Sequence, residues 1–195
     1  MVEPVLLESN GPVDLVGHSH GASIALKLAI RHPARIRSVI AYEPTMFWLV
    51  RSQGRSQDVQ GIVDAASDAA ELVSRGEREA AARRFIDFWN GPGTWDRIPA
   101  DRRSGPLQSI GFVSHWAHAS LCDATPLSAF STMTMPVLLM SGACSPLSGQ
   151  APAALLSTTI PDARLEIFEG LGHMAPLTHP EIINARIERF LDEVG

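Results

Sequence analysis

"VDLVGHSHGAS", residues 13–23, is the most informative stretch of this chain. Residues 13–16, three of them apolar, predict a strand that runs into Gly17, and an apolar helical pattern over residues 22–30 follows Gly21. A serine lies between the two glycines, with a histidine on each side. In a G-x-S-x-G turn between a strand and a helix, the serine hydroxyl stands above the edge of the sheet, and the tight turn favours glycine at both ends. The sequence therefore predicts that Ser19 is a nucleophile.

Strand patterns recur at both ends of the chain. Residues 36–42 and 136–140 each predict a buried strand, and residues 164–168 alternate as a strand does. A final helix begins at Pro180 and places four apolar residues on one face. These residues are Ile183, Ile187, Phe190 and Leu191. Strands that alternate with helices favour a mainly parallel sheet, so an α/β fold is expected.

The middle of the chain interrupts this alternation. It contains helical patterns and no convincing strand, and residues 52–61 are the part most typical of a mobile loop. We therefore expect an all-helical insertion over residues 45–134, between two core parts formed by residues 1–44 and 135–195.

Composition narrows the classes of function. The 195 residues are 45% hydrophobic and 19% charged, with a formal net charge of −5. This balance suits one sizeable core and lacks the basic character of nucleic-acid-binding proteins. The first residues do not resemble a signal peptide, and no apolar window is long enough to span a membrane. A cytoplasmic protein that binds neither nucleic acid nor membrane is expected.

The cysteines and the histidines of the middle segment do not indicate a metal site. Cys122 and Cys144 have neither a disulfide framework nor metal-ligand spacing, so two buried free thiols are expected. His115 and His118 lie three residues apart on a predicted helix, which gives too few ligands. The expected chemistry uses no metal and no cofactor. A thiol-based role for Cys144 is a weak alternative, because nothing positions a base beside it.

Two long segments carry a family resemblance. "DLVGHSHGASIALKLAIRHPARIRSVIAYEP" resembles the middle of an α/β-hydrolase-fold protein with a helical cap, and the segment from "PVLLMSG" to "EIINARIERFL" resembles its end. The resemblance implies a base after the last strand. His173, in "EGLGHMAP", has that place. It also implies that the backbone N–H of His20 helps to stabilise an oxyanion.

The acid of the triad departs from the common pattern. The family usually places it just after the strand predicted at residues 136–140, but no Asp or Glu occurs from Gly142 until Asp162. Some members place the acid one strand earlier, which corresponds here to Glu43 in "IAYEP". Its carboxylate would arise at the same sheet edge as Ser19. Asp123, near the end of the helical insertion, is the second candidate.

Aromatic side chains of the insertion suggest the nature of the substrate. The expected pocket residues are His18, Phe47, Trp48, Trp116 and Met174. Phe85 and Trp89 add to the aromatic content of the same segment. A pocket of this composition favours a small, apolar molecule.

The resemblance implies a serine hydrolase that acts on an ester or a similar small carbonyl compound through an acyl-enzyme. C–C hydrolases, acyltransferases and cofactor-free haloperoxidases share the fold, and the sequence does not separate them. A serine at the elbow argues against dehalogenases and epoxide hydrolases, which use aspartate. A scaffold without catalytic activity is the alternative from a different class.

The family's sheet has further strands before the elbow strand, and a loop among them gives a second oxyanion donor. Only residues 1–12 precede the elbow strand here. We therefore expect a shortened form of the fold that lacks one oxyanion donor. The strand at residues 13–16 would then be an apolar edge. We expect copies of the chain to form a dimer or aggregate through it, or the chain to need the missing segment.

Overall fold

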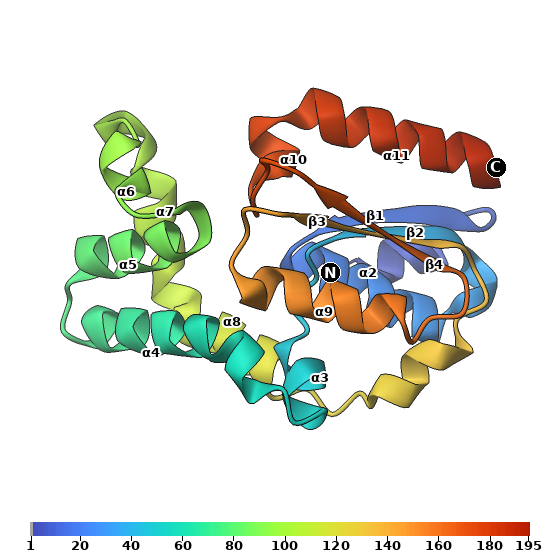
Figure 1. Ribbon diagram of the computed structural model, residues 1–195, viewed down its shortest axis with the longest axis horizontal. Coiled ribbons are helices and arrows are strands. Elements are labelled where there is room, and N and C mark those ends of the chain that lie inside the picture. The colour runs from blue at the N-terminus through green and yellow to red at the C-terminus, as the bar shows by residue number, and fades with distance from the viewer. Residues whose placement is uncertain (1) are drawn as a thin grey trace.

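The computed structural model describes residues 2–195, and its centre is one sheet of four parallel strands (Figure 1). The strands lie in the order of the sequence. They are β1 (Val13–His18), β2 (Ile36–Tyr42), β3 (Val137–Gly142) and β4 (Ala163–Phe168). Each strand runs parallel to its neighbour, and a helix follows each of the first three. The predicted α/β class with a mainly parallel sheet and a helical insertion is confirmed.

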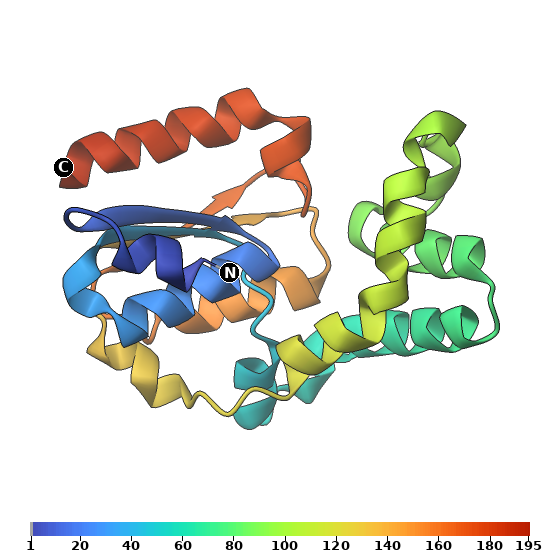
Figure 2. The ribbon, with the colours of Figure 1, turned by 180° about the vertical axis from the view of Figure 1, so that it is seen from behind.

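Helices cover both faces of this sheet. The helices α2 (His20–Arg31) and α9 (Leu147–Ser157) lie on one face, and α11 (Pro180–Val194) lies on the other (Figure 1). Three short elements complete the two core parts. They are α1 (Glu3–Leu7), which lies beside α2 in Figure 2, the 3-10 turn η1 (Pro33–Arg35) and α10 (Ala175–Thr178).

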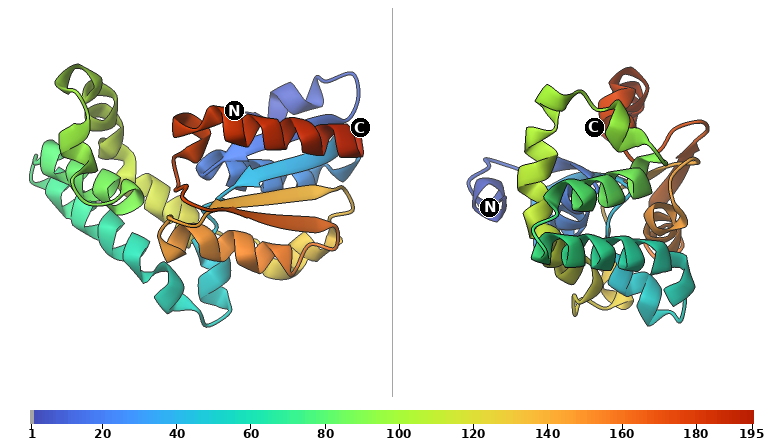
Figure 3. Two further views of the ribbon diagram at one scale, coloured as in Figure 1. Left: turned by 45° about the horizontal axis from the view of Figure 1, so that its top comes forward. Right: turned by 90° about the vertical axis from the view of Figure 1, so that its left-hand side faces the viewer.

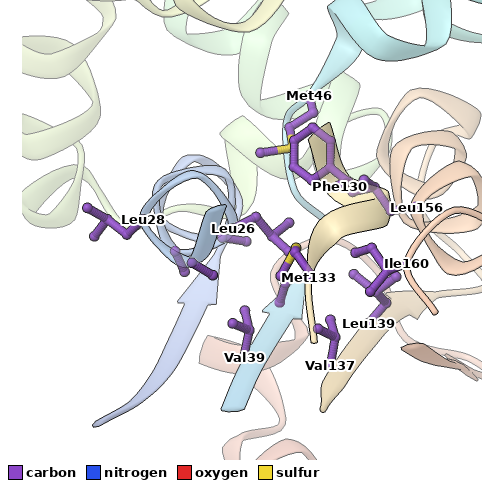
Figure 4. Close-up of a cluster of buried hydrophobic side chains, with 14 of the residues drawn as sticks. Leu26, Leu28, Val39, Met46, Phe130, Met133, Val137, Leu139, Leu156 and Ile160 are labelled. Atoms are coloured by element: carbon purple, nitrogen blue, oxygen red, sulfur yellow. The ribbon is translucent and has the colours of Figure 1, made fainter. Parts of the chain in front are cut away.

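The core has two layers because successive strand residues point to opposite faces. On β2, Val39 packs in the layer of α2 and α9, whereas the next residue, Ile40, packs under α11. Val137 and Leu138 of β3 divide in the same way. Figure 4 shows the larger layer, where Phe130 closes the space between α2 and α9. The predicted apolar face of α11 packs on the smaller layer.

The segment between β2 and β3 is entirely helical, and most of it extends beyond one end of the sheet (Figures 2 and 3). Its α-helices are α3 (Phe47–Ser52), α4 (Gln60–Ser74), α5 (Arg78–Asn90), α6 (Thr94–Arg97), α7 (Ser104–Ser109) and α8 (Val113–Leu121). Its 3-10 turns are η2 (Ser56–Val59), η3 (Ala100–Arg102), η4 (Ile110–Phe112) and η5 (Leu127–Thr132).

Two local expectations need correction. Residues 52–61 do not form one open loop, because η2 and the start of α4 occupy most of them and the apolar Val59 is fully buried. The two cysteines are free but exposed. Cys122 follows the last residue of α8, and Cys144 lies in the loop after β3, so neither is inside an element that packs into the core.

The outer strand β1 is hydrogen-bonded only to β2 within residues 2–195. Its residue Val16 is 53% exposed, because α11 covers the central strands and does not reach it. None of the helices in the described part of the chain combines the length and apolar character needed to cross a membrane.

Candidate active site

The predicted elbow is a sharp turn at Ser19, between the end of β1 and the start of α2. Ser19 has a φ of 56°, and its N–H donates to the carbonyl of Tyr42 at 2.9 Å. A Cβ at Gly17 would lie 2.6 Å from the backbone of Ala22, so helix and strand approach too closely for any side chain there. A Cβ at Gly21 would meet nothing within 4 Å. The close approach therefore requires glycine at the first position and not at the second.

His173 lies in the loop between β4 and α10, and its side chain is 5% exposed. Its Nε2 is 3.2 Å from Ser19 Oγ, and its Nδ1 is 2.6 Å from Glu43 Oε2. An ionised carboxylate only accepts hydrogen bonds, so the proton of the neutral imidazole belongs on Nδ1. Nε2 is then free to accept the hydroxyl proton of Ser19. The structure thus brings the three expected side chains into one hydrogen-bonded chain.

Glu43 directly follows β2 and is fully buried. Three groups at or just after the end of β3 donate to its Oε1: the hydroxyl of Ser141 at 3.0 Å, the N–H of Gly142 at 2.8 Å and the hydroxyl of Ser145 at 2.6 Å. Burial alone would raise the pKa of Glu43. The hydrogen bond and charge of His173, together with the hydrogen bonds from Ser145 and Gly142, outweigh burial and hold the pKa below its ordinary value.

The role of the segment "SGACS", residues 141–145, was not predicted. The segment contains no acid, but its two serines, one near the end of β3 and one in the loop after it, hold the acid that follows β2. Small hydroxyl residues at the end of a strand are the signal that could have indicated these donors.

The second candidate acid, Asp123, does not take part in the hydrogen bonds that link Ser19, His173 and Glu43. It pairs with Lys27. Burial would raise the pKa of Asp123, but the hydrogen bonds from Lys27 and Thr125 and the charge of Lys27 outweigh burial and lower this pKa to about 2.

An aromatic ring from the helical insertion covers the base. The ring of Trp89, on α5, stacks on the imidazole of His173 with 4.0 Å between centroids and 25° between planes. On another side, the ring of His18 lies 4.8 Å from that of His173. The sequence indicated Trp89 only as a pocket aromatic. The stacking depends on how the insertion folds over the sheet, which periodicity does not report.

A cavity of about 720 Å³ opens at Ser19, between the sheet edge and the insertion. Of the expected pocket residues, Phe47, Trp116 and Met174 line this cavity, together with Phe85 and Trp89. No lining residue in the described part of the chain is Asp, Glu, Lys or Arg. The walls are therefore apolar around a small number of hydroxyl, amide and imidazole groups.

Two expected pocket residues lie elsewhere. His18 hydrogen-bonds to the carbonyl of His173, because the residue before the elbow serine still belongs to β1. Trp48 donates to the carbonyl of Thr125 at 2.9 Å and lines a second cavity, of about 800 Å³. It follows Phe47 on α3, and adjacent helical residues point in different directions.

The backbone N–H of His20 is the expected oxyanion donor. His20 is the first residue of α2, so this N–H has no partner within the helix. The helix dipole also favours negative charge at this end. His20 also lines both cavities.

Among residues 2–195, no group of three or more His, Cys, Asp or Glu side chains is arranged to hold a metal ion.

A serine on a strand-to-helix turn, linked to a His–Glu pair at the carboxyl edge of a parallel sheet, defines a class of α/β proteins with a nucleophile elbow. Residues 8–180 match the alpha/beta hydrolase fold family, and the chain belongs to this family.

Named relatives and solved structures agree with this assignment. The chain is 29% identical to a 2-(acetamidomethylene)succinate hydrolase from Mesorhizobium japonicum, over 94% of this chain and 66% of that protein. It is 28% identical to a pimeloyl-[acyl-carrier protein] methyl ester esterase from Aromatoleum aromaticum, over 88% and 71% respectively. The structure of MGS-M2, an α/β hydrolase from a deep-sea metagenome library, superposes with a TM-score of 0.74 at 17% identity, covering 98% of this chain and 69% of that one. The chain thus spans about two thirds of the length of these proteins.

Proposed function

We propose that this chain hydrolyses esters of uncharged, apolar carboxylic acids through an acyl-enzyme on Ser19. The hydrogen-bonded chain from Ser19 through His173 to Glu43, which opens onto the apolar cavity, is the observation that carries the proposal. The similarity to a methyl ester esterase supports ester chemistry.

The proposed reaction has two halves. Ser19 Oγ attacks the ester carbonyl carbon while its proton moves to His173 Nε2, and the N–H of His20 stabilises the oxyanion. Glu43 stabilises the resulting imidazolium. The alkoxide leaves with the proton from His173, which completes the acyl-enzyme. His173 then takes a proton from a water molecule, whose oxygen attacks the acyl carbon. As the bond between this carbon and Ser19 Oγ breaks, His173 gives the proton to Oγ, which releases the acid and restores both residues.

The cavity walls support the restriction to uncharged acyl groups. A carboxylate on the substrate would lose its water there without gaining a cationic partner, a cost of several kcal/mol. The relative named for a succinate would therefore differ from this chain in its substrate.

The test is a rapid-mixing assay with p-nitrophenyl butyrate and p-nitrophenyl hydrogen succinate. The proposal predicts a burst of about one p-nitrophenol per chain with the butyrate, absent in Ser19→Ala. It also predicts a kcat/KM at least about 10-fold higher for the butyrate than for the succinate. Absence of turnover in a folded sample would favour a non-catalytic scaffold, and a preference for the succinate would refute the restriction on substrate.

A further inference from the structure

The loop that carries His173, residues 169–174, is held by its backbone carbonyls. Three consecutive carbonyl oxygens each accept a hydrogen bond of 2.8 Å from the carboxyl end of a different strand. The pairs are Cys144 N to Leu171 O, Tyr42 Oη to Gly172 O, and His18 Nε2 to His173 O. These donors come from just after β3 and from the last residues of β2 and β1.

His18 has a special place among these donors. It is peptide-bonded to Ser19 and hydrogen-bonded to the carbonyl of His173. A single residue therefore connects the backbone of the proposed nucleophile with the backbone of the proposed base.

The chemistry of His18 suits this contact. A carbonyl oxygen only accepts hydrogen bonds, so Nε2 of His18 must carry a proton. Burial, and then repulsion from nearby His173, lower the pKa of His18 to about 4. At neutral pH the ring is therefore an uncharged donor. A cationic donor in the same place would oppose the positive charge that His173 gains when it takes the proton of Ser19.

Tyr42 complements His18. Its side chain is buried, and its ring lies edge-on to the ring of His18 with 5.8 Å between centroids. Its hydroxyl contacts the carbonyl of Gly172, one residue before the base. The two donors thus act on adjacent peptide groups and restrict both the position and the rotation of the loop beside Ser19.

We infer that His18 and Tyr42 are positioning residues, which hold the backbone of the His173 loop so that the imidazole stays within reach of the Ser19 hydroxyl. The inference rests on the proposed function. Neither residue lines the cavity at Ser19, so both act through His173 and not on the substrate. A misplacement of about 1 Å in a reacting group can cost about 10²-fold in rate.

The experiment compares four variants. His18→Leu removes the donor with little change in volume, His18→Gln retains an N–H donor, and Tyr42→Phe removes only the hydroxyl. His32→Leu is the matched control, because His32 Nε2 also makes a hydrogen bond, to Glu3 at 2.7 Å, at the far end of α2. Folding is checked by circular dichroism.

Turnover of p-nitrophenyl butyrate and hydrogen–deuterium exchange of residues 169–174 are the two measurements. We expect His18→Leu to lower kcat about 10- to 100-fold with KM changed less than about 2-fold, and His18→Gln to recover most of the loss. Tyr42→Phe should lower kcat by a smaller factor, and His32→Leu should leave kcat unchanged. Exchange in the loop should rise in His18→Leu and Tyr42→Phe only.

Two results would overturn the inference: equal kcat values for folded His18→Leu and His18→Gln, or loop exchange that is the same in all variants. If the unmodified chain hydrolyses no ester, the proposed function is wrong. The exchange measurement then still decides whether His18 and Tyr42 hold the loop.

Discussion

Two residues of the site have unusual backbone angles. Ser19 and Glu43 have φ values of 56° and 45°, and they are the described residues other than glycine with positive φ. Such a conformation costs on the order of 1–2 kcal/mol per residue. Each residue directly follows a strand, and its N–H donates to a backbone carbonyl of the neighbouring strand, that of Tyr42 or Met140. The unusual angles turn both side chains toward His173, which is how two adjacent strands contribute to one site.

Substitution of Glu43 tests the assignment of the acid. Glu43→Gln keeps the shape of the side chain but loses the charge that orients and stabilises the imidazolium. We expect kcat for p-nitrophenyl butyrate to fall by about 10²–10⁴-fold. Asp123→Asn is the control, since Asp123 contacts Lys27 and not His173. A large loss in Asp123→Asn with normal turnover in Glu43→Gln would reverse the assignment.

The depressed pKa of Glu43 predicts a pH dependence of stability. Because folding lowers this pKa, the ionised carboxylate stabilises the folded chain above the ordinary glutamate pKa. The contribution is lost as the pH falls through the folded-state value. The difference in unfolding free energy between the unmodified chain and Glu43→Gln, from urea titrations at pH 7 and pH 4, should therefore shrink at pH 4. A difference that grows at pH 4 would contradict this account.

At the scale of elements, the junction of β1 and α2 depends on one glycine. A methyl group at Gly17 would lie 2.6 Å from the backbone of α2, whereas one at Gly21 would lie in open space. Gly17→Ala should therefore separate strand and helix and destabilise the fold by at least about 1–3 kcal/mol. Gly21→Ala should leave stability unchanged or raise it, because alanine favours helix more than glycine does. Thermal unfolding of the two variants measures this. Equal midpoints would mean that the junction is looser than described.

The sequence predicted the elements better than the contacts between them. Strand alternation and apolar spacing located all four strands and the face of α11, because these patterns are local. The helix after the elbow begins earlier than its apolar pattern, at His20, because polar residues can form the first turn. The triad side chains were expected from motifs and family resemblance. The stacking of Trp89 and the donors around Glu43 were not expected, since they depend on packing between distant segments.

At the scale of the whole molecule, the two outer strands differ in how well they are protected against pairing with another chain. Val16 on β1 and Ile167 on β4 are about equally exposed, at 53% and 54%. β4 also carries Arg164 and Glu166, and charged side chains on an edge oppose pairing with another chain. The edge of β1 has less charge, so association between copies should occur there.

Light scattering of two variants tests this difference. The unmodified chain should self-associate at micromolar concentration, Val16→Lys should shift it toward the monomer, and Ile167→Lys should have a smaller effect. An unmodified chain that is monomeric across the concentration range would contradict the prediction.

Covalent labelling with a fluorophosphonate, followed by mass spectrometry of the intact chain and its peptides, tests the central claim most directly. The account predicts one adduct per chain, located on Ser19, and a labelling rate reduced by at least about 10²-fold in both His173→Ala and Glu43→Gln. An adduct on another residue, or a rate at Ser19 that does not depend on His173, would contradict it.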